Sequence, residues 1–135
     1  MKKINVLLLL KPKTELACIV EDMSVRQVLE KMNAHGYMAI PVVTKNGEYA
    51  GTITEGDLLW KLVEEEGDIE ALDDINIKEI VRKDYTNPVK VDANIEELTA
   101  MITEQNFVPV IDDRNILMGI VTRKSVLKAL LEDEA

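Results

Sequence analysis

Two matching segments, residues 51–57 and 119–125, carry the side chains best suited to bind a small molecule. The first reads Gly-Thr-Ile-Thr-Glu-Gly-Asp and the second Gly-Ile-Val-Thr-Arg-Lys-Ser. In the first segment we expect a strand to end and a helix to begin at Thr54. In the second segment we expect the same at Thr122. The free backbone amides and positive dipole end of a helix start, beside a hydroxyl group, can hold a phosphate. Both junctions are therefore predicted anion-binding positions.

Asp57 places a carboxylate one helical turn after Thr54. A carboxylate there can accept hydrogen bonds from a ribose diol, and it would serve equally well as a first-turn helix acid. Taken alone, this spacing is more often a helix cap. The recurrence of the junction in both segments favours a binding site. As an exposed first-turn acid, Asp57 would contribute at most about 1 kcal/mol to stability, so we expect Asp57→Ala to weaken ligand binding without unfolding the chain.

The second junction differs in charge, because Arg123 and Lys124 stand where the first has Glu55 and Gly56. Two cations at a helix start could bind a polyphosphate in an otherwise acidic chain. Arg123 could equally be a surface residue paired with one of the many acids.

No arrangement of residues suggests catalysis. The sequence has one histidine and one cysteine, no nucleophile elbow and no Walker-type phosphate loop. We therefore expect a protein that is not an enzyme, holds no metal and requires no cofactor.

The two junctions belong to a repeat that must position them. Pro41 and Gly51 recur at the same spacing as Pro109 and Gly119, with a polar turn between them in each copy. An amphipathic helix precedes each proline, and capping pairs begin these helices at Ser24 with Gln27 and at Asn94 with Glu97. Each copy therefore predicts strand, helix, strand, strand, helix.

The predicted fold class is α/β (α+β), with two β-α-β-β-α repeats packed sheet to sheet about a pseudo-twofold axis. We expect a first motif with an N-terminal strand segment over residues 1–63, an acidic connector over 64–83 and a second motif over 84–135. The connector is interpreted as solvated, with Ile77, Ile80 and Val81 packing as a short helix.

The composition of the chain limits which partners and which cellular location we expect. Sixteen basic against twenty-five acidic residues give a net charge of -9, which argues against a nucleic-acid partner. The apolar run from Ile4 to Leu10 is too short to cross a membrane, so no membrane partner is expected. A lone Cys18 is typical of a reducing compartment, which predicts a cytoplasmic location.

One pattern occurs twice in the chain: a capped helix, a Pro-Val strand, a turn, Gly-x-x-Thr and a helix opening near an aspartate. This pattern resembles the CBS-domain family, named after cystathionine β-synthase. The resemblance covers about Lys11 to Leu131, in the family's tandem-pair arrangement. It implies a regulatory protein that binds AMP, ADP, ATP, S-adenosylmethionine or a cyclic dinucleotide in the clefts between motifs and signals to an unknown protein partner.

Carried over by position, the resemblance makes Asp57 the ribose contact and Thr54 and Thr122 the phosphate-side hydroxyls, with backbone at the Pro-Val strands bordering the adenine. Ser125 departs from the family's aspartate, and Asn87 with Pro88 could contact the ligand or simply form a turn. The candidate ligand-binding residues are Ile40, Pro41, Thr52, Thr54, Asp57, Asn87, Pro88, Val108, Pro109, Thr122, Arg123, Lys124 and Ser125.

The resemblance also implies a homodimer, with Leu58, Leu62, Leu127 and Leu130 as candidate contacts unless they only complete the core. The alternative function is a ligand-free dimerisation or protein-interaction module, which Ser125 in place of the second aspartate permits.

Overall fold

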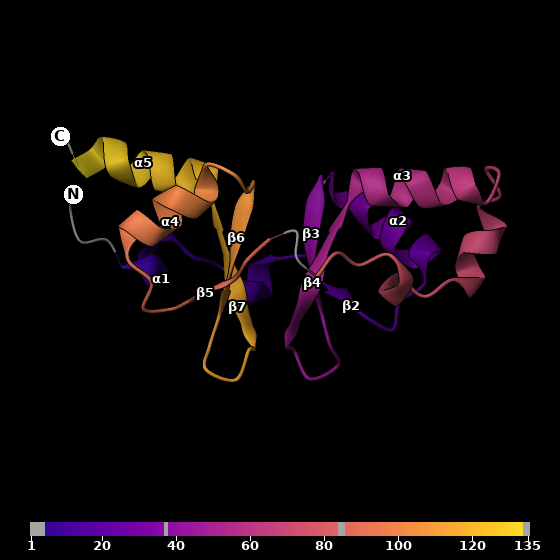
Figure 1. The fold of residues 1–135 in the computed structure, drawn as a ribbon, viewed down its shortest axis with the longest axis horizontal. Helices are drawn as coiled ribbons and strands as arrows, with labels where there is room; N and C mark the ends of the chain where they lie inside the picture. Colours follow the sequence, from indigo (N-terminus) through magenta and orange to yellow (C-terminus); the bar gives the residue numbers. More distant parts are fainter. Residues whose placement is uncertain (1–4, 37, 84–85, 134–135) are drawn as a thin grey trace. The chain divides into compact units, whose positions relative to one another are not determined.

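The computed structural model describes residues 5–36, 38–83 and 86–133. The chain forms two compact units (Figure 1). We call residues 17–85 the first-repeat unit, and residues 1–16 together with 86–135 the second-repeat unit.

The first-repeat unit holds a three-stranded sheet in the order β2-β3-β4 with two helices. Strand β2 pairs in parallel with β3, and β3 pairs antiparallel with β4. Helices α2 and α3 lie on the same side of the β3–β4 hairpin (Figure 1). In chain order the elements are β2 (Ile19–Val20), α2 (Val25–His35), β3 (Ala39–Val43), β4 (Tyr49–Thr54) and α3 (Glu55–Glu64). This confirms the predicted order.

Local signals fix the ends of these elements. The Gln27 amide donates a hydrogen bond to Ser24 Oγ, and the Ser24 amide donates one to Gln27 Oε1, so the predicted capping box is present. Gly36 ends α2 in the left-handed conformation, at a φ of 67°, which glycine adopts without a side-chain clash. Asn46 and Gly47 form the predicted polar turn between β3 and β4, where Gly47 has a φ of 88°, and an Asn-Gly pair is typical of such hairpin turns.

The connector contributes to the core of the first-repeat unit. It contains two short 3₁₀ turns, η2 (Glu70–Asp74) and η3 (Ile77–Glu79). Leu72 and Ile77 are fully buried among the core side chains. Arg26 of α2 binds the Asp73 carboxylate at 3.0 Å. The expectation of a solvated connector is therefore wrong at Leu72. The turn that carries this leucine folds back onto α2, and burying the side chain there is favourable.

Leu72→Ala should destabilise the chain by about 2–5 kcal/mol, because it removes buried methyl groups and leaves a cavity. Urea unfolding would measure the loss. Ile69→Ala is the matched control, since Ile69 precedes the same turn and is 47% exposed. Equal effects of the two substitutions would show that the connector does not pack as described.

The second-repeat unit repeats this arrangement with one added strand. Its four-stranded sheet has the order β1-β7-β6-β5, in which β5 is parallel to β6 and β7 pairs antiparallel with both β6 and β1. Helix α4 has eight residues against eleven in α2. The elements are α1 (Val6–Leu9), β1 (Lys11–Pro12), η1 (Lys13–Glu15), β5 (Val89–Lys90), α4 (Ile95–Ile102), β6 (Phe107–Ile111), β7 (Leu117–Thr122) and α5 (Arg123–Asp133).

The N-terminal segment lies in this unit, although in sequence it precedes the first repeat. Residues 6–9 of the leading apolar run form a short helix with Val6 fully buried, and Ile4 lies outside the described residues. Lys11 then pairs with Ile120, and Pro12 with Gly119. Most of the leading apolar run is therefore a helix, and the two-residue strand β1 that follows it pairs in the sheet of the second-repeat unit, not with the first repeat.

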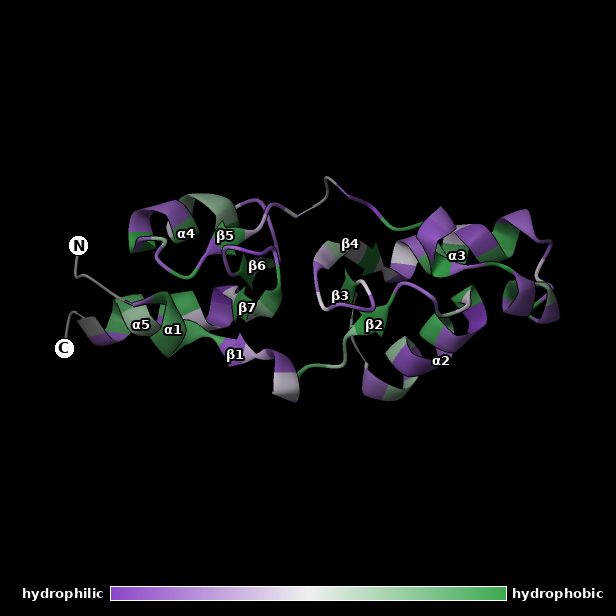
Figure 2. Ribbon diagram, turned by 90° about the horizontal axis from the view of Figure 1, so that it is seen from below, coloured by the Kyte–Doolittle hydropathy of each residue, from purple (hydrophilic) through white to green (hydrophobic). Residues whose placement is uncertain are grey.

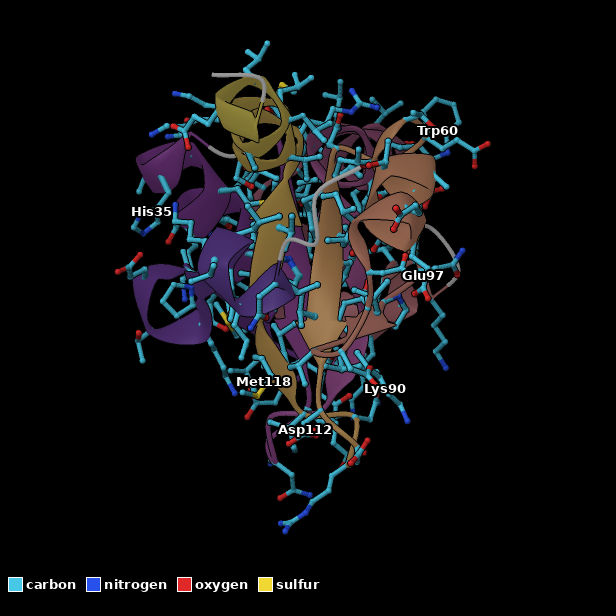
Figure 3. All side chains as sticks on the ribbon, turned by 90° about the vertical axis from the view of Figure 1, so that its left-hand side faces the viewer. His35, Trp60, Lys90, Glu97, Asp112 and Met118 are labelled. Carbon is cyan, nitrogen blue, oxygen red and sulfur yellow. The ribbon has the colours of Figure 1, made fainter. Side chains whose placement is uncertain are left out.

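The β6–β7 hairpin turns at Asp112 (Figure 3), whose carboxylate accepts hydrogen bonds from the amides of Arg114 and Ile116. Asn115 has a φ of 67°, a conformation that asparagine tolerates better than most residues. This turn thus replaces the Asn-Gly turn of the first repeat by aspartate side-chain bonding.

Candidate functional site

The first predicted junction begins α3 with a complete capping box. The Asp57 amide donates to Thr54 Oγ1 at 3.2 Å, and the Thr54 amide donates to Asp57 Oδ2 at 3.0 Å. These bonds satisfy two backbone donors that a helix start leaves unpaired. The helix-cap interpretation of Thr54 and Asp57 is thus correct, and it leaves a carboxylate fixed at the helix start.

Asp57 also forms an ion pair with Arg82. Arg82 Nε lies 2.7 Å from Asp57 Oδ1, so both carboxylate oxygens have a hydrogen-bond partner. The Asp57 side chain is only 9% exposed, whereas that of Arg82 is 53% exposed. The expectation of an exposed Asp57 is therefore wrong, because capping and ion pairing together cover the carboxylate.

The connector places Arg82 at this junction. Arg82 and Thr52 exchange two backbone hydrogen bonds of 3.0 Å each, which cover the outer edge of β4. Sequence analysis missed Arg82 because its partner lies 25 residues earlier, beyond the reach of any local pattern. The available signal was an arginine near the end of an otherwise acidic connector.

The other first-copy candidates lie on the paired strands β3 and β4. Ile40 pairs with Ile53 and Pro41 with Thr52, next to the junction. Thr52 is fully buried, and its hydroxyl lies 2.8 Å from the Tyr49 hydroxyl. The structure therefore brings the first-copy candidates together, but it places the Thr52 hydroxyl in the core.

The second junction begins α5 with a different set of bonds. The Ser125 amide donates to Thr122 Oγ1 at 3.2 Å, as the Asp57 amide does in the first copy. The Ser125 hydroxyl donates to the Thr122 carbonyl at 2.9 Å. Serine thus supports the helix start but supplies no carboxylate for a ribose.

Arg123 binds the end of a neighbouring helix. Its Nε donates to the Ile102 carbonyl at 2.7 Å and its Nη2 to the Thr103 carbonyl at 3.3 Å. A cation at these unpaired carbonyls also stabilises the negative end of the α4 dipole. The structure gives Arg123 this helix-capping role, which is neither of the two expected from the sequence. Lys124 beside it is exposed.

The remaining second-copy candidates surround β5 and β6. The Asn87 amide donates to Gln105 Oε1 at 3.1 Å, and Gln105 Nε2 donates to the Phe107 carbonyl at 3.2 Å. Pro88 is the residue directly before β5, and Val108 and Pro109 are buried in β6. Gln105, which sequence analysis did not single out, thus ties the turn at Asn87 to the start of β6.

Two general properties concern the whole described chain. Within residues 5–36, 38–83 and 86–133, no helix has both the length and the apolar character needed to cross a membrane. Over the same residues, no three histidine, cysteine or acidic side chains lie together as a metal site would require.

The repeated strand–helix junctions have counterparts in known proteins. The family model described as "CBS domain" matches residues 9–64 and again residues 77–132. The chain belongs to the CBS domain family. Both matches together cover most of the sequence, so this is a tandem CBS pair.

Solved CBS structures share the fold. CbpB in complex with c-di-AMP superposes with a TM-score of 0.86 at 28% identity, covering 98% of this chain and 91% of that one. A CBS domain protein from Streptococcus pneumoniae superposes with a TM-score of 0.85 at 28% identity, covering 94% and 86%.

Curated relatives are longer. A homoserine O-acetyltransferase from Methanocorpusculum labreanum is 28% identical over 80% of this chain, which spans 21% of that protein. The chain spans between 13% and 43% of the lengths of the first curated relatives. The chain therefore matches less than half the length of each of these three relatives.

Proposed function

We propose that this CBS pair is a regulatory, non-catalytic module that binds an adenosine-containing nucleotide of the AMP, ADP or ATP type and signals its occupancy to a protein partner. The observation that carries the proposal is the Asp57 carboxylate, fixed at the start of α3 by the Thr54 amide and largely shielded from water. A fixed carboxylate can accept hydrogen bonds from ribose hydroxyls without losing side-chain entropy.

Further features support the same ligand class. The helix start offers backbone amides and the Thr54 hydroxyl on the phosphate side. Strand β3 places Ile40 and Pro41, both buried, opposite Ile53 and Thr52 and next to the junction, and in our proposal the planar base lies against this strand. The similarity to a CbpB structure in complex with c-di-AMP supports an adenosine-containing ligand and makes a cyclic dinucleotide the first alternative to a mononucleotide.

Thermal-shift screening tests the proposal. AMP, ADP, ATP, S-adenosylmethionine and c-di-AMP would each be added to the purified chain at millimolar concentration. A ligand at 100 times its Kd should stabilise the folded state by about 2.7 kcal/mol and raise the Tm. The absence of a shift with all five compounds would contradict nucleotide binding.

A second candidate function is a dimerisation module, and the exposed apolar face of α3 favours it. Leu59, Trp60 and Val63 are 63%, 68% and 58% exposed. The mixed colours of α3 in Figure 2 are typical of an amphipathic helix, and Trp60 is labelled in Figure 3. A second copy of the chain that covered this face would bury all three side chains.

The contacts expected from the sequence need correction. Leu58 is buried, and Leu62 and Leu130 pack against the cores of their own units. These three leucines therefore complete the core. Leu127 on α5 is 60% exposed and stays a candidate, and Leu131 joins it at 71%.

Leu59→Glu should weaken self-association by on the order of 100-fold, because a twofold dimer loses the buried leucine twice. Light scattering coupled to size exclusion, over a range of concentrations, would measure this. The fluorescence of Trp60, the only tryptophan in the sequence, provides a second readout. Leu8→Glu is the control, since Leu8 is 82% exposed and lies outside α3. A wild-type chain that stays monomeric at all concentrations would exclude this dimer.

A further inference from the structure

We infer that Arg82 is a specificity-determining residue that makes the Asp57 site select phosphate-bearing ligands over neutral nucleosides. The inference rests on the proposed nucleotide-binding function and assigns the discrimination within that site to one side chain of the connector.

Access to the Asp57 carboxylate is limited by its two hydrogen-bond partners. One carboxylate oxygen accepts the Thr54 amide and the other accepts Arg82 Nε, and the side chain is 9% exposed. The Thr54 bond belongs to the α3 cap and persists while the helix is folded. The Arg82 guanidinium is the partner that can leave, because it is half exposed on a long, flexible side chain. A ribose diol that binds Asp57 must therefore displace or share this guanidinium.

A displaced Arg82 guanidinium can move only as far as its backbone allows. The Arg82 backbone is held on the edge of β4 by the paired hydrogen bonds with Thr52. Directly beside them, a side chain on Gly51 would collide with Val81 and the Arg82 carbonyl, so this part of the connector lies against the strand without a gap. The guanidinium therefore stays tethered close to the start of α3, where a phosphate would be bound.

The charge balance then differs between ligands. A neutral nucleoside replaces the Arg82–Asp57 pair by hydroxyl bonds and supplies no anion for the half-exposed guanidinium, so the attraction between the two charges is lost without compensation. A nucleoside monophosphate brings an anion that the same guanidinium can bind, often through two parallel hydrogen bonds. Arg82 thus opposes binding of the nucleoside and favours binding of the nucleotide.

The test compares the affinities of the full chain for AMP and adenosine by isothermal titration calorimetry. In the Arg82→Gln variant, the ratio of AMP affinity to adenosine affinity should fall about tenfold, with adenosine binding at least as tightly as to the wild type. Lys78→Gln is the matched control, because Lys78 lies on the same connector, is 59% exposed and contacts Glu21 only at 3.8 Å. This variant should keep the wild-type ratio.

Conservative and salt-dependent measurements separate selectivity from a structural role. Arg82→Lys keeps the charge and should restore part of the ratio. In the wild type, raising the salt concentration should also lower the ratio of AMP affinity to adenosine affinity, as Arg82→Gln does. An equal loss of affinity for both compounds in Arg82→Gln, or an unchanged ratio, would overturn the inference alone. Failure of the wild type to bind either compound would overturn the proposed function and the inference with it.

Discussion

Gly51→Ala is expected to destabilise the chain by about 3 kcal/mol, which is a large share of the stability of an ordinary domain. Gly51 has a φ of +144°, a conformation that residues with a side chain rarely adopt. An added Cβ would lie 2.5 Å from Val81 Cγ1 and 2.7 Å from the Arg82 carbonyl oxygen. The backbone oxygen cannot move away without breaking the hydrogen bonds between Thr52 and Arg82.

Urea unfolding monitored by circular dichroism would measure this effect, with Gly56→Ala as the control. Gly56 lies in the first turn of α3, where an added Cβ meets no atom closer than 3.7 Å. Alanine there should be neutral or stabilise the helix by up to about 1 kcal/mol, since it has the higher helix propensity. A Gly51→Ala variant as stable as the wild type would show that the connector does not lie against β4.

The same requirement explains the recurrence of this glycine. At Gly119, the counterpart in the second repeat, an added Cβ would collide with the Lys11 carbonyl oxygen of the paired strand β1. In each unit a segment from elsewhere in the chain covers the outer edge of the second hairpin strand, and glycine leaves room for it. The sequence displays the repeated glycine, whereas only the structure identifies the segment that requires it.

The order of elements could be predicted because its signals are local. The helix start at Ser24, the helix end at Gly36 and the Asn-Gly turn each depend on residues a few positions apart. The Thr54–Asp57 cap was predicted for the same reason. The internal repeat predicted two such units, and the family resemblance identified them as a tandem CBS pair.

The missed features all join residues that are distant in sequence. Arg82 reaches Asp57 from the connector, Arg123 reaches the end of α4, and Lys11 pairs with Ile120. Leu72 lies in an acidic stretch of the sequence, so no local pattern predicted its burial. The burial depends on packing against a helix whose position the sequence did not show. Charge patterns could suggest that Arg82 and Arg123 bind something, but not what.

Asp57→Asn should weaken AMP binding by about 10- to 100-fold, because a hydrogen bond to a charged group contributes about 1.5–3 kcal/mol. Asparagine is a better substitute than alanine, since its amide oxygen can still accept the Thr54 amide and preserve the cap. Alanine would remove the cap and the partner of Arg82 together, so a loss of binding could follow from a loss of stability.

The ribose assignment is tested by changing the ligand as well as the residue. Titration calorimetry with AMP and 2′-deoxy-AMP should give a smaller effect of Asp57→Asn on the deoxy compound, because one of the hydroxyls that the carboxylate would bind is absent. Glu55→Gln removes a negative charge from an exposed position in the same helix turn and should change neither affinity by more than a few-fold. Equal losses for both ligands in Asp57→Asn would mean that the carboxylate acts through Arg82 or the local charge, and not through the ribose.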